Sequence, residues 1–266
     1  MLVFFAISGF LVTASWRSDP NVLRFAARRV LRLWPALAVM LAVCISLIAF
    51  MMAEAGDGGL VLQVVTYLLP NFVFFWSDGQ FFQGNPVAYF NGQLWSVGVE
   101  MQCYIALAAI GLAARDRLRL ALTVVAAIIL GMYFTGRNFD ATELPLLFKT
   151  QVPVNMASMF LAGALACVVP LLLDARVVAG AVVAGVACAL AGLSGLALVL
   201  LIPFVVVFVG IKSLPVLRRA GRFGDLSYGI YLWTWPVEQV VVKLLGTKTP
   251  VLVLLPATLC LVLPLA

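Results

Sequence analysis

A carboxylate inside an apolar stretch is the feature of this sequence that most directly suggests chemistry. Glu100 closes the segment Asn91 to Glu100 (N-G-Q-L-W-S-V-G-V-E), and further apolar residues follow it. Residues four apart share one face of a helix, so Ser96, Glu100 and Tyr104 are expected to line up. An ionised carboxylate is costly in a bilayer, so it is either functional or held by an ion pair or hydrogen bonds within the bundle. Glu100 is therefore a candidate acid, base or orienting residue.

A second polar pattern runs along the later apolar stretch 226–245. Tyr228, Tyr231, Trp235 and Glu238 recur at intervals of three, four and three. This spacing predicts a polar and aromatic stripe on one face of a membrane helix, kinked near its proline. An aromatic belt at the membrane interface would also produce such a stripe, although a belt accounts less well for Glu238 on the same face.

Arginines cluster before the first long apolar stretch. Arg24, Arg28 and Arg32 recur every four residues, beside a parallel apolar stripe, which predicts an amphipathic helix at the cytoplasmic interface. Asp19 suits the N-cap of this helix and Pro20 its first turn. The arginines are suited to lipid headgroups or to a bound anion, because guanidinium groups match phosphate geometry, and both interpretations stay open. A coenzyme A thioester or a nucleotide sugar would fit an anion site.

One residue type is absent: the sequence contains no histidine, the commonest general acid or base near neutral pH. The sequence also has no Walker loop, no dinucleotide-binding glycine motif and no metal-ligand cluster, so no metal and no bound cofactor are expected. Its five cysteines lie in apolar stretches and are interpreted as small buried side chains. In the N-terminal stretch, Ser8-Gly9 is expected to permit close approach of two helices.

Membrane helices must position these residues. Of 266 residues, 64% are hydrophobic and only 11% are charged, which excludes a soluble globular domain, a disordered tail and a secreted disulfide scaffold. At roughly 20 residues per span, the composition predicts an all-α transmembrane bundle of about nine or ten membrane segments. The candidate spans are 1–16, 34–53, 59–76, 94–114, 120–135, 152–173, 177–193, 196–211, 226–245 and 250–266.

Basic residues concentrate in three connections, 17–33, 115–119 and 212–225, and give a net charge of +6. The positive-inside rule places all three in the cytoplasm, and no soluble domain is present to bind nucleic acid. Three candidate spans separate the first two connections, although an odd number of crossings should switch sides. One segment near 59–93 is therefore predicted to be re-entrant or broken, close to Pro70, with a cavity near 70–100.

Taken in order, four segments resemble the acyltransferase 3 family of bacterial membrane proteins. The similarity covers essentially the whole chain, as a single transmembrane domain, 1–266, apparently truncated at both ends. The matches are Phe4 to Leu11 with F-F-x-x-S-G-F-L, Arg28 to Pro35 with R-R-x-x-R-x-x-P, Asn91 to Glu100 with N-G-x-L-W-[ST]-x-x-x-E, and Ser227 to Pro236 with S-Y-G-I-Y-L-x-x-x-P.

The resemblance implies transfer of an acyl group, usually acetyl, from acetyl-CoA or another acyl-CoA to a hydroxyl of a cell-envelope or exported glycan. It implies a multi-pass protein of the bacterial cytoplasmic (inner) membrane and does not indicate an oligomeric state. Arg28, Arg29 and Arg32 would bear on the donor, and Glu100 would be the family's glutamate. The remaining substrate-site candidates are Ser8, Asn91, Trp95, Ser96, Tyr104, Ser227, Tyr228, Tyr231 and Glu238.

The sequence departs from the family at its start. Members begin with a helix that carries D-G-L-R and, about ten residues later, a histidine thought to be the catalytic base. Such a helix is expected before Met1, and the chain is expected to be inactive without it. Some members also have a histidine where this chain has Trp235. The alternatives are a catalytically dead partner subunit, or a transporter or flippase that uses Glu100 and Glu238.

Overall fold

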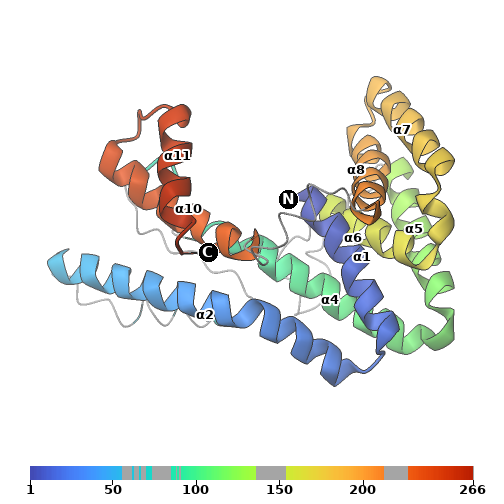
Figure 1. The fold of residues 1–266 in the computed structure, drawn as a ribbon, viewed down its shortest axis with the longest axis horizontal. Helices are drawn as coiled ribbons and strands as arrows, with labels where there is room; N and C mark the ends of the chain where they lie inside the picture. The colour runs from blue at the N-terminus through green and yellow to red at the C-terminus, as the bar shows by residue number, and fades with distance from the viewer. Residues whose placement is uncertain are drawn as a thin grey trace. The chain divides into compact units, whose positions relative to one another are not determined.

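The computed structural model of the chain describes a set of residues in which every regular element is a helix (Figure 1). These residues are 1–55, 62, 66, 70–73, 85–87, 89, 91–135, 154–212 and 227–265. The predicted all-α class is confirmed. Three described stretches, Val22–Leu47, Leu94–Gly131 and Ser194–Ile211, are long and apolar enough to cross a membrane.

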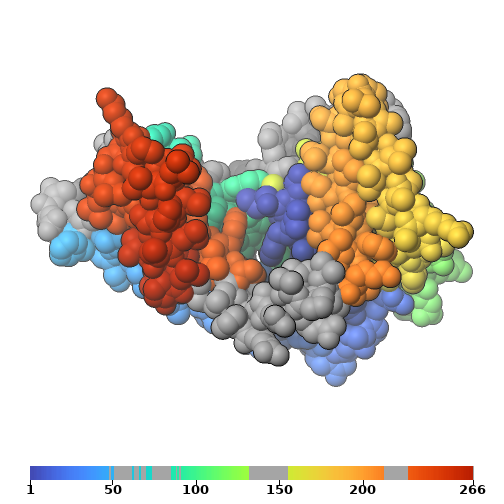
Figure 2. Space-filling model, turned by 45° about the horizontal axis from the view of Figure 1, so that its top comes forward, coloured from blue at the N-terminus to red at the C-terminus, as the bar shows by residue number. Residues whose placement is uncertain are grey.

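The chain divides into two compact units. Unit 1 comprises Met1–Phe25 and Val99–Arg219. Its helices are α1 (Leu2–Ser18), the greater part of α4 (Leu94–Ala114), α5 (Leu118–Thr135), α6 (Val154–Val168), α7 (Ala175–Leu190) and α8 (Ser194–Ile211), with two short 3-10 turns, η1 (Arg115–Arg117) and η3 (Pro170–Leu173). Helix α1 packs against α6 and α8, α6 also packs against α5, and α7 pairs with α8 along adjoining surfaces (Figure 2).

Small residues bring α1 and α6 together, as the Ser8-Gly9 pair predicted. A Cβ atom on Gly9 would lie 1.9 Å from the carbonyl oxygen of Phe160, and one on Gly163 would lie 2.0 Å from that of Ala6. Side chains at these two positions would therefore force the helices apart. In membrane proteins such close contact replaces the hydrophobic driving force that water supplies to soluble proteins.

Unit 2 comprises Ala26–Gly98 and Ala220–Ala266. It contains most of α2 (Val22–Ala55), together with α10 (Ser227–Leu245) and α11 (Val251–Val262). Helices α10 and α11 pack against each other and are joined by a short turn at Gly246. Gly246 adopts a φ of 94°, a left-handed conformation that glycine adopts without strain.

Two predictions about the arginine-rich segment need correction. The amphipathic helix predicted around Arg24, Arg28 and Arg32 is not separate from the predicted span 34–53, because α2 continues through Pro35 to Ala55. A proline within a helix removes one hydrogen bond and favours a kink, which is tolerated in membrane helices. The N-cap of α2 is Asn21 rather than Asp19, because the Asn21 side chain accepts a 3.0 Å hydrogen bond from the backbone nitrogen of Arg24.

Apart from 59–76, most of which lies outside the described residues, the other predicted spans agree with the described helices to within a few residues, except for 152–173. There the α-helix ends at Val168, and Pro170 opens a 3-10 turn that extends to Leu173. The helical region is disfavoured for the residue before a proline, and Val169 accordingly lies outside it, with a φ of −124° and a ψ of 81°. The predicted re-entrant segment near 59–93 and its cavity lie mostly outside the described residues, as do the connections 136–151 and 213–225.

Candidate active site

The clearest polar cluster of unit 1 surrounds Glu100. Ser8 Oγ on α1 donates a 3.0 Å hydrogen bond to Glu100 Oε1 on α4. The hydroxyl of Tyr104, one helical turn further along α4, donates to the same oxygen, and the two hydroxyl oxygens lie 3.2 Å apart. All three side chains are buried, with 8%, 3% and 3% exposure for Ser8, Glu100 and Tyr104. Two hydroxyl groups and one carboxylate therefore share a site enclosed by helices.

Packing around the cluster fixes its geometry. Helix α1 contacts α4 again two turns after Ser8, where the indole of Trp16 lies against Gly111. The ring of Tyr104 lies beside that of Phe160 on α6, with centroids 6.2 Å apart. Because Gly9 holds α1 against the same residue of α6, the Ser8 hydroxyl cannot move far from the Glu100 carboxylate.

The hydrogen bonds to Glu100 offset the electrostatic cost of burying its carboxylate. A buried carboxylate is costly unless hydrogen bonds or an opposite charge replace its water shell. The hydroxyl groups of Ser8 and Tyr104 supply such bonds to Glu100. A carboxylate held in this way can accept a proton from a substrate hydroxyl or orient another base. The bonds are equally what a purely structural role would require.

A second polar cluster lies in unit 2, at the start of α4. The hydroxyl of Tyr231 on α10 donates a 2.7 Å hydrogen bond to the carbonyl oxygen of Gln93 and also contacts the Ser96 hydroxyl. The Gln93 side chain also bonds to α10, since its amide nitrogen donates a 2.8 Å hydrogen bond to the carbonyl oxygen of Leu232. These bonds join the first turn of α4 to α10.

The predicted stripe on α10 makes contacts along most of its length. The hydroxyl of Tyr228 donates to the carbonyl oxygen of Leu33 at 3.2 Å, and Trp235 Nε1 donates to that of Tyr89 at 3.0 Å. The Trp235 ring also lies against Gly92, where a Cβ atom would approach it to 2.7 Å. The stripe therefore positions the segment that precedes α4, including the N-G pair of the predicted motif.

Four candidates remain to be placed. Asn91 is buried, and its side-chain oxygen lies 4.0 Å from the Cys44 thiol, within hydrogen-bonding range for sulfur. Trp95 is half-buried and Ser227 is exposed. Glu238 is half-buried, and no hydrogen bond or ion pair joins it to another described residue. Three of the four stripe residues thus have clear structural contacts, and Glu238 does not.

Comparison with known proteins identifies the family. The model of the acyltransferase 3 family, described as an acyltransferase domain, matches residues 1–266. The chain belongs to this family. Nodulation protein 10 of Rhizobium leguminosarum bv. viciae is 30% identical over 154 residues, which cover 53% of this chain and 40% of that protein. The chain thus spans less than half the length of this curated relative. No solved structure matches the chain.

Family membership confirms the resemblance inferred from the four segments. It also makes the chain a membrane protein, whose apolar helices contact the lipid bilayer. The acyltransferase 3 motif from Asn91 to Glu100 spans the boundary between the units, so Ser96 makes its contacts in unit 2 and Glu100 in unit 1. The single domain predicted over 1–266 and the roles assigned to individual residues stay predictions.

The family's arginine motif lies near the start of α2. Arg28 and Arg29 are half-buried, whereas Arg32 is exposed. Arg24, which shares the stripe but not the motif, pairs with Asp19 at 2.8 Å. The predicted stripe therefore includes Arg24, which pairs with a carboxylate of its own chain, and two arginines of the acyltransferase 3 motif, Arg28 and Arg32.

Sequence reasoning missed two glutamines. Gln93, inside the N-G-Q-L-W motif, bonds to α10 through both its backbone and its side chain. Gln239 directly follows the last stripe position, Glu238, and accepts two hydrogen bonds from the Asn85 side chain, at 3.0 and 2.8 Å, through its backbone and side-chain oxygens. Both are neutral polar residues within apolar stretches, and that is the signal that would have identified them.

Proposed function

We propose that this chain is a membrane O-acyltransferase of the bacterial cytoplasmic membrane. It transfers an acyl group, usually acetyl, from acyl-CoA to a hydroxyl of a cell-envelope or exported glycan. Family membership supports the reaction class, and the observation that carries the assignment to a site is the buried Glu100 carboxylate between the Ser8 and Tyr104 hydroxyls.

The reaction sets clear chemical demands. The acceptor hydroxyl oxygen attacks the thioester carbonyl carbon, a carbon–oxygen bond forms, and the carbon–sulfur bond breaks. The hydroxyl proton must pass to a base, and the departing coenzyme A thiolate must regain a proton. Glu100 is the proposed base or the residue that orients it, and Ser8 and Tyr104 hold its carboxylate in place.

The donor is proposed to bind through its phosphates. Arg28, Arg29 and Arg32 supply guanidinium groups at the start of α2, and paired guanidinium contacts suit phosphate oxygens. Ser96 and Tyr231, whose hydroxyls contact each other, are proposed to contact the acceptor, as is Glu238. No resident metal or cofactor is required by this chemistry.

The test is transfer of labelled acetyl from acetyl-CoA to membrane glycans. The chain is assayed alone and joined to an N-terminal helix that carries D-G-L-R and the family histidine, since its dependence on such a helix stays a prediction. Loss of general-base catalysis in Glu100→Gln should lower the rate about 10²- to 10⁴-fold. Asp116→Asn is the matched control, because that carboxylate lies exposed in η1.

Three results would redirect the assignment. Full activity in Glu100→Gln would remove that residue from catalysis. A lack of transfer by both forms of the chain would favour an inactive partner subunit. Movement of a glycan lipid across proteoliposomes without acetyl transfer would favour a transporter or flippase.

A further inference from the structure

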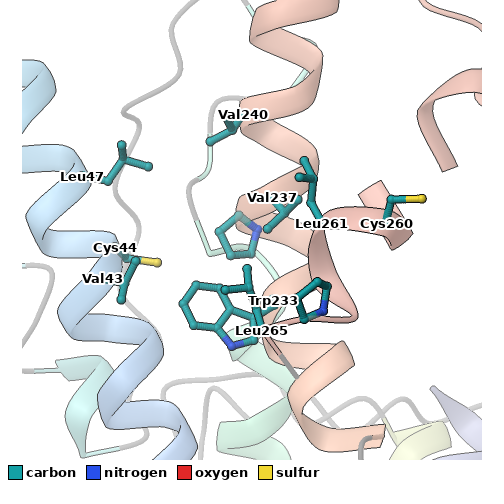
Figure 3. A pocket seen from close by; sticks show the side chains of 11 residues that line it. Val43, Cys44, Leu47, Trp233, Val237, Val240, Cys260, Leu261 and Leu265 are labelled. Atoms are coloured by element: carbon teal, nitrogen blue, oxygen red, sulfur yellow. The ribbon is translucent and has the colours of Figure 1, made fainter. Parts of the chain in front are cut away.

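Unit 2 contains an apolar cavity that none of the chemistry above uses. Its volume is about 430 Å³, and it lies between α2, α10 and α11 (Figure 3). Val43, Cys44 and Leu47 extend from α2 toward Trp233 and Val237 on α10, and Leu261 and Leu265 close it from the C-terminal segment. This volume is within the usual range of roughly 300–1,000 Å³ for ligand sites.

The cavity lies on the side of α10 away from its polar stripe. At 3.6 residues per turn, Trp233, Val237 and Val240 fall on one face, nearly opposite Tyr231 and Trp235. Helix α10 therefore separates two environments within unit 2. One face bonds to the segment that precedes α4, and the other presents apolar side chains to the cavity.

The lining restricts what the cavity can hold. It contains no charged residue and no hydroxyl or amide side chain. Its potential polar groups are the indole N–H of Trp233 and two thiols: that of Cys260 points away from the space, and that of Cys44 contacts Met40 and Asn91. A polar ligand group placed here would lose most of its hydrogen bonds to water without replacement, so the ligand is hydrocarbon along most of the wall.

The volume of the cavity and its opening at the surface favour a long hydrocarbon chain as the ligand. An apolar cavity of about 150 Å³ already binds benzene, so this larger cavity would be poorly filled by an acetyl group. Val43, Leu261 and Leu265 are 48%, 52% and 49% exposed, so the lining reaches the surface of α2 and of the segment around α11. Since α2 is long and apolar enough to cross a membrane, we expect its exposed surface at Val43 to face lipid.

From these observations we infer that the cavity is a binding site for one hydrocarbon chain of a membrane lipid. The hydrocarbon chain of the lipid enters beside Val43 and packs against Trp233 and Val237. Because the Cys44 thiol contacts both the cavity and Asn91, an occupied cavity would also support the motif that precedes α4. The inference concerns binding and does not depend on the proposed acyl transfer.

The experiment uses the full chain in phosphatidylcholine vesicles that contain a phospholipid with a photoactivatable group in its acyl chain. After illumination, mass spectrometry compares labelling of peptides from α2 and α10 with labelling of the exposed face of α11 at Leu252. Val43→Trp and Val237→Phe reduce the cavity. Val39→Trp is the matched control, since it replaces an exposed valine one turn earlier on α2 that does not line the cavity.

We expect labelling at 43–47 and 233–240 to fall severalfold in Val43→Trp and in Val237→Phe, and to remain in Val39→Trp. Labelling at Leu252 should be the same in all variants, which also shows that each has inserted. Equal labelling of the cavity peptides in every variant would overturn the site. Labelling by a photoactivatable long-chain acyl-CoA but not by the phospholipid would overturn the assignment to a membrane lipid. The same measurement in Glu100→Gln separates this site from catalysis, because binding should be unchanged there.

Discussion

Ser8 on α1 and Glu100 on α4 are joined by a 3.0 Å hydrogen bond across 92 residues of sequence. Both side chains are more than nine-tenths buried, so the bond forms inside the helix bundle of unit 1. The Tyr104 hydroxyl shares the same carboxylate oxygen. A serine within the F-F-x-x-S-G-F-L motif and a glutamate at the end of N-G-x-L-W-S-x-x-x-E therefore belong to one structural feature.

Removing the Ser8 hydroxyl should cost stability in a measurable but limited way. Hydrogen bonds between membrane helices contribute about 0.6 kcal/mol on average and at most about 1.7 kcal/mol, so Ser8→Ala should lose an amount in that range. Thermal unfolding in detergent measures the change. Ser46→Ala is the control, because the exposed Ser46 hydroxyl bonds, among the described residues, to the carbonyl oxygen of Ala42 in its own helix. A loss in Ser8→Ala no larger than in Ser46→Ala would contradict the prediction.

The Tyr104 hydroxyl should act jointly with that of Ser8. Tyr104→Phe removes the hydroxyl and keeps the ring beside Phe160, so packing is preserved. Because both hydroxyls contact one carboxylate oxygen and each other, the effects of the two substitutions should not add. A double-mutant cycle on unfolding should give a coupling energy of about 0.5 kcal/mol or more. Strict additivity would show that the two hydroxyls act independently.

Sequence periodicity predicted the helices but not their pairings. Apolar runs and the four-residue spacing placed Glu100 and Tyr104 on one helix, and the stripe from Tyr228 to Trp235 on another, and both helices are present. The pairing of Ser8 with Glu100 could not be predicted, because periodicity indicates the face of a helix and not its neighbour. In lipid, nearly every face is apolar, so hydrophobicity adds little to that choice.

The start of a helix was predicted less well where two neighbouring residues could both serve as its N-cap. Asp19 and Asn21 are both good N-caps, and the spacing to the Arg24 nitrogen favours Asn21, leaving Asp19 to pair with the Arg24 guanidinium. Gln93 was missed because a single neutral amide shows no periodicity; its polarity in an apolar stretch marks it as a candidate but does not indicate its partner. Its role follows only from its contacts with Leu232 and Tyr231.

Close packing of α1 on α6 should make two glycines intolerant of substitution. An added Cβ atom at Gly9 or Gly163 would overlap a backbone carbonyl oxygen of the facing helix, which cannot rotate away as a side chain would. Gly9→Ala and Gly163→Ala should therefore each destabilise unit 1 and displace Ser8 from Glu100. Gly180→Ala on α7 is the control, because nothing lies within 4 Å of its added Cβ atom. That control should gain up to about 1 kcal/mol from helix propensity.

Melting temperature and acetyl transfer would be measured for all three glycine variants. Unchanged stability in Gly9→Ala would show that the two helices are not in contact at that position. Reduced stability in Gly180→Ala would show that a glycine in these helices can be required for a reason other than lack of space for a side chain.

Tyr231→Phe should loosen the start of α4. The substitution removes the hydrogen bond to the Gln93 carbonyl oxygen and the contact with Ser96, while the aromatic ring remains. Hydrogen–deuterium exchange should rise in the peptide around 91–96, because those amides would open more often. Thr234→Val is the control on the same helix, since the hydroxyl of Thr234 bonds to the carbonyl oxygen of Ile230 within α10 and to no other residue that the structure describes. Equal exchange in the two variants would contradict a positioning role for Tyr231.

Arg32 and Arg24 provide the sharpest test of the donor site, because they lie two turns apart on the same stripe of α2. Arg32 belongs to the acyltransferase 3 motif, whereas Arg24 lies outside it and pairs with Asp19 at 2.8 Å. Loss of a charged hydrogen bond to phosphate costs about 1.5–3 kcal/mol, so Arg32→Ala should raise the KM for acyl-CoA by about 10- to 100-fold. Arg24→Ala should leave that KM nearly unchanged. Added salt should weaken donor binding in the unsubstituted chain more than in Arg32→Ala, because screening acts on the arginine–phosphate attraction. An equal rise in KM for both variants would instead indicate a general effect of positive charge at the membrane surface.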